Sequence, residues 1–159
     1  FLDPWYYQIN ELGYNYRASE INCALGLSQL KRLKSSIRNR GKIAAVYKKE
    51  LKNFPQISFP KNSFENKYNA WHLFSILIDF KKIGISRRKF MNKLEAKGIV
   101  TQVHYIPLFM RPLYKKLKDK KFEGALEYYE KNLSLPMYAS LNSKNVKYVC
   151  SSIKKILTN

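Results

Sequence analysis

The sequence predicts an α/β fold in which helices cover one face of a small sheet. Three observations lead to this prediction. A long helical pattern runs from Ser19 to about Lys52, segments rich in β-branched and aromatic residues follow it, and helical patterns end the chain. The expected order is helix, strand, strand, helix, strand, helix, helix. With 159 residues, of which 45% are apolar, the chain is long and apolar enough to bury a real core.

The first helix is the longest expected element. Ser19 suits its N-cap position, and Gly41 indicates a break or kink within it. Apolar residues recur at helical spacing along it: Ile21, Ala24, Leu25, Leu27, Leu30, Leu33, Ile37, Ile43, Val46, Tyr47 and Leu51. Such a helix is long enough to link a large domain to a small one.

Prolines, glycines and polar caps divide the rest of the chain. Ser86 is the expected N-cap of one helix, and Gly98 is the expected residue just past its end. Alternate residues of the segment after Gly98, from Val100 through His104, share one side of an expected strand. We expect strands over 57–59, 70–78 and 99–106, and helices over 86–97, 122–133 and 143–157.

The net charge of +19 raises the question of a polyanionic partner. The positive residues are scattered in pairs such as Lys31-Arg32 and Lys48-Lys49, which fits solvated helix faces and a codon bias towards A and T. No zinc-finger spacing, RNP-like segment or basic zipper is present in the sequence. We therefore expect no nucleic-acid partner. A non-catalytic basic module that binds nucleic acid or another polyanion remains the alternative.

Other features of the sequence point to a cytoplasmic protein without a membrane partner. No apolar run approaches the roughly 20 residues of a membrane span, and no signal peptide is visible. Cys23 and Cys150 both fall on apolar helical faces, where we expect buried free thiols. His72 and His104 are far apart, which argues against a metal site. By itself, each of these histidines is interpreted as a packed, hydrogen-bonded strand residue.

The segment Gly13-Tyr14-Asn15-Tyr16-Arg17 lies immediately before the long helix. Asn15 and Arg17 offer an amide and a guanidinium that can donate hydrogen bonds to a phosphate. A helix start also favours anions, through its free N–H groups and its dipole. Two structural alternatives stay open. Asn15 can satisfy a turn, and Arg17 can pair with a carboxylate such as Glu11 or Glu20.

Three segments together carry a resemblance to a known family. Residues 13–20 resemble the signature G-[FY]-N-[FY]-R-x-[ST]-[DE] of the DegT/DnrJ/EryC1/StrS sugar aminotransferases. The second match is the segment 101–107, Thr-Gln-Val-His-Tyr-Ile-Pro, and the third is 128–138, which contains Ser-Leu-Pro-Met-Tyr. The resemblance covers nearly the entire chain. It is strongest to the subgroup that makes pseudaminic acid precursors.

The resemblance implies the C-terminal part of a fold type I transferase that depends on pyridoxal 5'-phosphate (PLP). Its expected parts are the end of the large cofactor domain (1–18), a long linking helix region (19–53), and a small α/β domain (54–159) with a short, mainly antiparallel sheet. The lysine that forms the Schiff base with the cofactor would lie upstream of Phe1. This chain alone should therefore contain no catalytic residue and be inactive.

The resemblance also assigns roles to four residues. Asn15 would bind the cofactor phosphate of the partner subunit, which implies a homodimer with shared active sites. Arg17, His104 and Tyr105 would position a UDP-linked keto sugar, with glutamate as the amino donor. One departure is the stretch 108–114, which lacks the His and Gln of the common "LH-x-QP-x-Y" form. A PLP-binding regulator or an isomerase-like relative is a further reading, since fold does not fix function.

Overall fold

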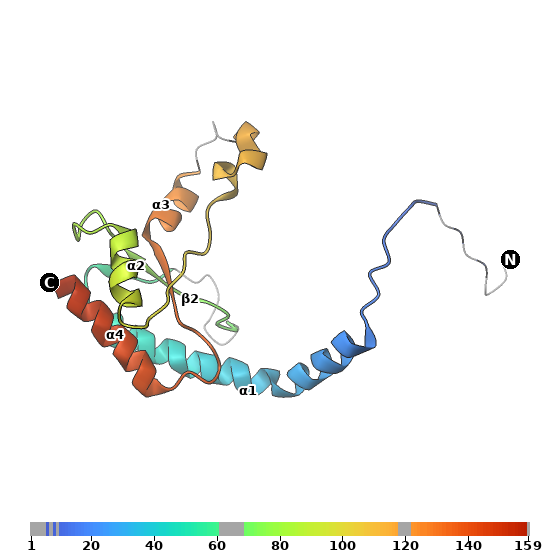
Figure 1. The fold of residues 1–159 in the computed structure, drawn as a ribbon, viewed down its shortest axis with the longest axis horizontal. Coiled ribbons are helices and arrows are strands. Elements are labelled where there is room, and N and C mark those ends of the chain that lie inside the picture. Colours follow the sequence, from blue (N-terminus) through green and yellow to red (C-terminus); the bar gives the residue numbers. More distant parts are fainter. Residues whose placement is uncertain (1–5, 7, 9, 61–68, 118–121, 159) are drawn as a thin grey trace. The chain divides into compact units, whose positions relative to one another are not determined.

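The computed structural model describes residues 6, 8, 10–60, 69–117 and 122–158, and it has the predicted α/β arrangement (Figure 1). Contacts divide the chain into two compact units, residues 1–34 and 35–159. The elements in chain order are α1 (Glu20–Leu51), β1 (Ile57–Ser58), β2 (Phe74–Ile78), α2 (Arg87–Glu95), the 3₁₀ helices η2 (Leu108–Met110) and η3 (Pro112–Leu117), α3 (Glu123–Lys131), β3 (Asn132–Leu135) and α4 (Ser143–Thr158).

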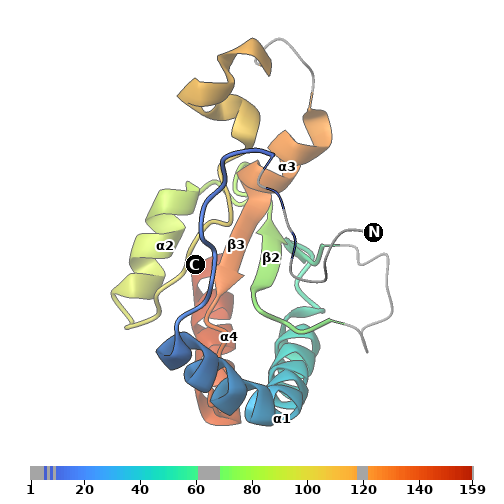
Figure 2. The same ribbon diagram turned by 90° about the vertical axis from the view of Figure 1, so that its right-hand side faces the viewer.

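The sheet of the second unit has three short strands in the order β1-β2-β3, and both pairings are antiparallel. β2 lies in the centre, with Ile57 opposite Ile78 on one side and Phe74 opposite Leu135 on the other. Figure 2 shows β2 and β3 side by side. The expected short antiparallel sheet is therefore confirmed.

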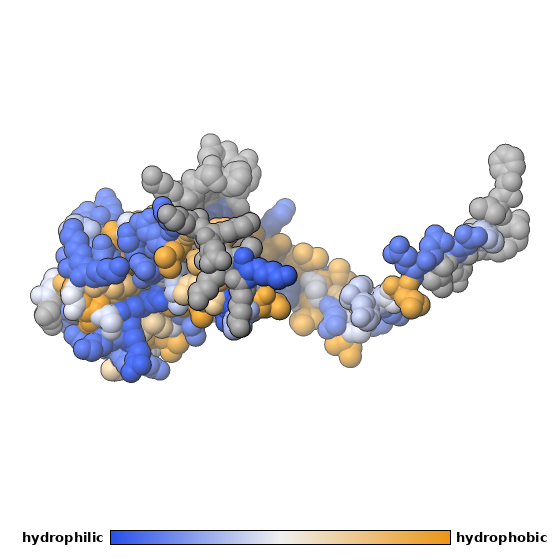
Figure 3. All heavy atoms as spheres, turned by 90° about the horizontal axis from the view of Figure 1, so that it is seen from above, coloured by the Kyte–Doolittle hydropathy of each residue, from blue (hydrophilic) through white to orange (hydrophobic). Residues whose placement is uncertain are grey.

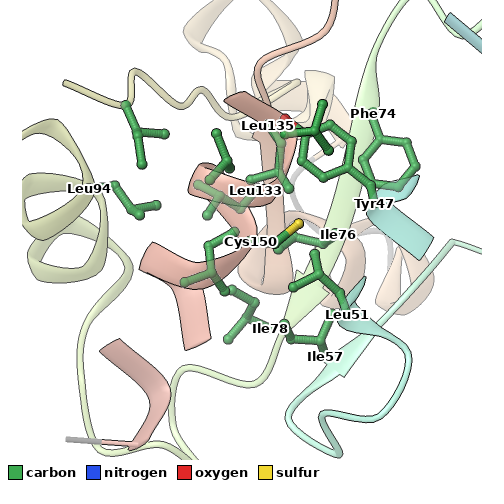
Figure 4. Close-up of a cluster of buried hydrophobic side chains, with 14 of the residues drawn as sticks. Tyr47, Leu51, Ile57, Phe74, Ile76, Ile78, Leu94, Leu133, Leu135 and Cys150 are labelled. Atoms are coloured by element: carbon green, nitrogen blue, oxygen red, sulfur yellow. The ribbon is translucent and has the colours of Figure 1, made fainter. Parts of the chain in front are cut away.

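The hydrophobic core lies between one face of this sheet and three helices. Alternate residues of β2 are buried, as a strand with a covered face requires. The second half of α1, α2 and α4 supply the other side. Figure 4 shows these side chains pointing toward one another around Cys150. The members labelled there are Tyr47, Leu51, Ile57, Phe74, Ile76, Ile78, Leu94, Leu133, Leu135 and Cys150.

Two helix boundaries follow directly from local chemistry. The Ser86 side chain accepts a hydrogen bond from the backbone N–H of Lys89, so Ser86 is the N-cap of α2 as predicted. Gly98 has a φ of 72°, the left-handed conformation that glycine adopts at little cost just past a helix. The helix α1 is continuous through Gly41, so the break expected at that glycine is absent.

The predicted third strand is wrong, and the true one was missed. The segment 99–106 makes only an isolated bridge, between Gln102 and Ser134. The third strand is β3, which begins at Asn132 directly after α3 ends at Lys131. The helix predicted over 122–133 overlaps the first two residues of β3, Asn132 and Leu133. The order at this point is thus helix then strand, not strand then helix.

In the first unit, the described residues are exposed to solvent. The backbone N–H of Asn22 donates to the Ser19 side chain, which confirms Ser19 as the cap of α1. Apolar residues of α1 here include Ile21 and Leu25, and Figure 3 shows hydrophobic residues at the surface along this part of the helix. Cys23 is exposed rather than buried, because no described residue of this unit covers its helix face. Cys150 is buried, as expected.

No helix in the described part of the chain is long and apolar enough to cross a membrane.

Candidate functional site

Asn15 and Arg17 lie side by side in the turn that leads into α1. The backbone N–H of Arg17 donates to the Asn15 side-chain oxygen at 3.1 Å, which forms a local Asx-type turn. The turn-forming alternative for Asn15 is therefore real. It occupies the amide oxygen, while the NH₂ group makes no hydrogen bond within the described residues. Both side chains are exposed.

Helix α1 begins at Glu20, directly after this turn, and Ser19 caps it. Ser19 accepts from Asn22 through its side chain, and its carbonyl accepts from Cys23 at 2.9 Å. The Arg17 guanidinium forms no ion pair with Glu11 or Glu20 among the described residues, so its structural alternative has no support here. An amide NH₂, a guanidinium and a helix start thus form an exposed set of donors suited to a phosphate.

His104 lies in the second unit, held by two residues of β3. Its Nδ1 is hydrogen-bonded to the Ser134 hydroxyl at 2.9 Å. Its carbonyl accepts a hydrogen bond from the Asn132 side-chain amide at 2.6 Å. The expected strand around His104 does not form, because the Asn132 side chain, rather than backbone of β3, takes this carbonyl. His104 is hydrogen-bonded as interpreted, but it is half-buried and lies outside any strand.

Tyr105 follows His104 and is two-thirds exposed, at 66%. The two rings meet edge to face, with centroids 4.5 Å apart. Tyr105 is therefore largely open to solvent, with one part of its ring against His104. His72 differs from its expected packed position: it lies before β2 and is exposed.

The residues that support His104 were not predicted from the sequence. Ser134 and Ser75 face each other across the β2–β3 pair, and their hydroxyl oxygens are 3.0 Å apart. Asn132 is fully buried and Ser134 is 4% exposed. The motif Ser134-Leu135-Pro136 was noted in the sequence, and a serine on a buried strand beside a polar neighbour was the available signal for this role.

Ser75 also lines a pocket of about 220 Å³. Its other walls include Lys48, Asn69, Trp71 and Tyr128. Trp71 has a φ of 50°, which is uncommon outside glycine, and the Asn69 side chain accepts a hydrogen bond from its backbone N–H at 2.8 Å. The Lys48 ammonium lies 4.8 Å from the Trp71 ring centroid, a cation–π contact. A cation, an aromatic ring and a serine hydroxyl thus share one pocket.

Comparison with known proteins now adds to this geometry. Residues 3–154 match the model of the DegT/DnrJ/EryC1/StrS aminotransferase family. This chain belongs to that family. The resemblance inferred from its three motifs is therefore confirmed.

Three relatives show the extent of the similarity. The chain is 36% identical over 154 residues to the UDP-4-amino-4,6-dideoxy-N-acetyl-beta-L-altrosamine transaminase of Campylobacter jejuni, covering 96% of this chain and 40% of that protein. It is 34% identical to the spore coat polysaccharide biosynthesis protein SpsC of Bacillus subtilis, covering 96% and 40%. The structure of Helicobacter pylori PseC, an aminotransferase involved in pseudoaminic acid biosynthesis, matches with a TM-score of 0.85 at 30% identity, covering 99% and 42%.

A fourth match concerns the cofactor. A protein described as a possible sugar aminotransferase, Spr1654 of Streptococcus pneumoniae, has been solved in its PLP form and matches with a TM-score of 0.80 at 25% identity, over 97% of this chain and 39% of that one. The chain thus spans about 40% of the length of the relatives it matches.

Proposed function

We propose that this chain is the C-terminal part of a PLP-dependent aminotransferase that acts on a UDP-linked 4-keto-6-deoxy amino sugar, with glutamate as the amino donor. The observation that carries the proposal is the match to the transaminase of C. jejuni at 36% identity across 96% of the chain. The product would serve surface-polysaccharide or pseudaminic acid biosynthesis in the cytoplasm.

The domain division belongs to the same proposal. Residues 1–18 would complete the large cofactor domain, 19–53 would link it to the rest, and 54–159 would form the small domain. The second half of α1 packs into the core of the small domain through Tyr47 and Leu51, so this linking region would transmit the position of one domain to the other.

The exposed donors before α1 fit a cofactor phosphate. In this proposal the Asn15 NH₂ group donates to the phosphate of PLP bound by the partner subunit, so that two copies share each active site. The Asx turn supports this role, because accepting from Arg17 holds the Asn15 amide in one orientation. When bound, PLP supplies the electron sink for amino transfer, and the Schiff-base lysine would lie in the part of the protein upstream of this chain.

Arg17, His104 and Tyr105 would bind the nucleotide sugar. The guanidinium suits a diphosphate because it offers several donors in a fixed fork. The His104 imidazole and the hydroxyl of Tyr105, an exposed residue, can donate to diphosphate or sugar oxygens without acid–base chemistry. These residues orient the substrate, and none of them takes part in bond making.

Mixing two inactive variants of the complete protein tests the shared site. One subunit carries Asn15→Ala, and the other lacks the upstream Schiff-base lysine. If Asn15 serves the partner, a mixed dimer contains one site with both intact residues, and activity returns to a fraction of the wild-type level. If no activity returns in dimers shown by mass to be mixed, Asn15 does not act across the interface.

The alternative function, a positively charged module that binds polyanions, makes a different prediction. A polyanion-binding module would bind a nucleic-acid oligomer with an affinity that falls steeply with salt and does not depend on PLP. The aminotransferase proposal expects bound-PLP absorbance in the complete protein, lost on borohydride treatment, and turnover of the UDP-linked keto sugar. Salt-dependent oligomer binding together with no PLP binding would overturn it.

A further inference from the structure

The hydrogen bonds around His104 continue beyond its immediate partner. His104 Nδ1 is 2.9 Å from the Ser134 hydroxyl oxygen, which is 3.0 Å from the Ser75 hydroxyl oxygen. The three groups come from the segment after Gly98, from β3 and from β2. They form a hydrogen-bonded relay, His104–Ser134–Ser75, that ends at the pocket lined by Ser75.

The polar hydrogens of His104, Ser134 and Ser75 can be placed in this relay in two ways. Ser134 is 4% exposed, so its single hydroxyl hydrogen must go to one of its two neighbours. In the first arrangement, Ser75 donates to Ser134 and Ser134 donates to His104 Nδ1. In the second, the Nδ1–H of His104 donates to Ser134 and Ser134 donates to Ser75, whose own hydrogen then turns toward the pocket.

The surroundings favour the first arrangement. Lys48 lines the same pocket as Ser75, and its ammonium lies over the Trp71 ring, so this pocket carries a positive charge. A positive charge there favours a Ser75 hydroxyl that turns its oxygen toward the pocket and its hydrogen toward Ser134. The Asn132 amide donates to the His104 carbonyl at 2.6 Å, which fixes the backbone that carries the ring.

We propose that Ser75 and Ser134 are positioning residues that hold the ring proton of neutral His104 on Nε2. The imidazole then presents an N–H donor at Nε2 without a positive charge. The relay itself does not depend on the enzyme's activity, whereas the use of this donor for a diphosphate or sugar oxygen rests on the function proposed above.

The test reads the His104 ring nitrogens directly, by NMR of the chain with ¹⁵N-labelled histidine in alkaline buffer, where imidazole is neutral. The sequence contains only one other histidine, His72, which is exposed and serves as the internal reference. We expect a single Nε2–H tautomer for His104. Ser134→Ala should replace it with a mixture of tautomers, whereas Ser134→Thr, which keeps a hydroxyl, should preserve it.

The matched control is Ser58→Ala, which removes an exposed hydroxyl from β1 of the same sheet and should leave the His104 signals unchanged. Backbone amide spectra show whether each variant keeps the fold. A protonated Nδ1 in the wild-type chain, or a single Nε2–H tautomer in folded Ser134→Ala, would overturn the proposal.

A kinetic readout in the complete enzyme separates the two proposals. Ser134→Ala should raise the KM for the nucleotide sugar about 2- to 10-fold, the worth of one hydrogen bond, with little change in kcat. Ser134→Thr should restore KM. If the wild-type enzyme has no aminotransferase activity while the NMR result holds, the proposed function fails and the relay stands. An unchanged KM in Ser134→Ala would remove the donor role of His104 in substrate binding.

Discussion

At the scale of single residues, Tyr47 shows how a polar group is accommodated in the core. Its ring stacks on Phe74 at a centroid distance of 4.9 Å, and its hydroxyl donates to the Pro136 carbonyl at 3.0 Å. Burial raises the pKa of Tyr47, so the hydroxyl stays protonated as a donor. Tyr47→Phe keeps the ring and leaves the carbonyl unpaired, and we expect a loss of about 1 kcal/mol in the free energy of unfolding by urea.

The matched control for this prediction is Tyr148→Phe. The Tyr148 hydroxyl also donates to a backbone carbonyl, that of Lys97 at 3.1 Å, but Tyr148 is 51% exposed. Water can replace that bond, so the control should lose less stability. Equal losses in the two variants would show that burial does not set the value of the Tyr47 bond.

The two cysteines should differ sharply in reactivity. Burial raises the pKa of Cys150 to about 12, whereas Cys23 is exposed. Because the thiolate is the reactive form, the folded chain should react with a thiol reagent such as DTNB at Cys23 alone. A Cys23→Ser variant should release colour only after denaturation. Rapid reaction of that folded variant at pH 8 would contradict the buried position of Cys150.

At the scale of elements, an ion pair joins the two helices that flank the core. Lys154 on α4 donates to Glu50 on α1 at 2.9 Å. This hydrogen bond and charge lower the pKa of Glu50 below its ordinary value of about 4.3. The pair therefore adds stability above that pH, and the contribution is lost as pH falls through the lowered pKa.

Replacing the carboxylate tests this pH dependence. Glu50→Gln should be less stable than the wild type near pH 7 in urea unfolding. The difference should shrink as the pH falls through the lowered pKa of Glu50, because the protonated carboxyl is then as neutral as the Gln amide. Glu127→Gln is the control, because the Glu127–Lys131 pair lies within α3 and joins no two elements. A difference for Glu50→Gln that stays constant from pH 7 to 3 would exclude the ion pair as its cause.

Whether an element could be predicted from the sequence depended on whether its signals are local. Helices were predictable because their stripes and caps are local, as Ser86 and Gly98 show. The strand expected at 99–106 has the right alternation, but pairing is a non-local property: backbone bonds with Ser134 form at Gln102, and the Asn132 side chain then takes the His104 carbonyl. β3 was missed because a strand of four residues directly after a helix is too short to show an alternation of apolar and polar residues.

The candidate site was predictable to a similar degree. Asn15, Arg17, His104 and Tyr105 stand in contiguous motifs, so the sequence could single them out. Their supports could not be found in this way, because Ser75 and Ser134 are distant in the chain and meet only through strand pairing.

At the scale of the whole molecule, stability and the proposed phosphate site belong to different units. All the buried hydrophobic residues of the described chain, from Ile43 to Ile156, lie in residues 35–159. Asn15 and Arg17 lie in residues 1–34. Because burial of apolar surface supplies most of the driving force for folding, the second unit should fold without the first.

A chain that begins at Ser35 tests this separation. We expect it to unfold cooperatively in urea with nearly the same midpoint as the 159-residue chain, because no buried core residue is removed. The His104 signals should also be unchanged, because the Ser134 and Ser75 hydroxyls remain in the fragment. A broad, non-cooperative transition would show instead that folding of the core depends on residues 1–34.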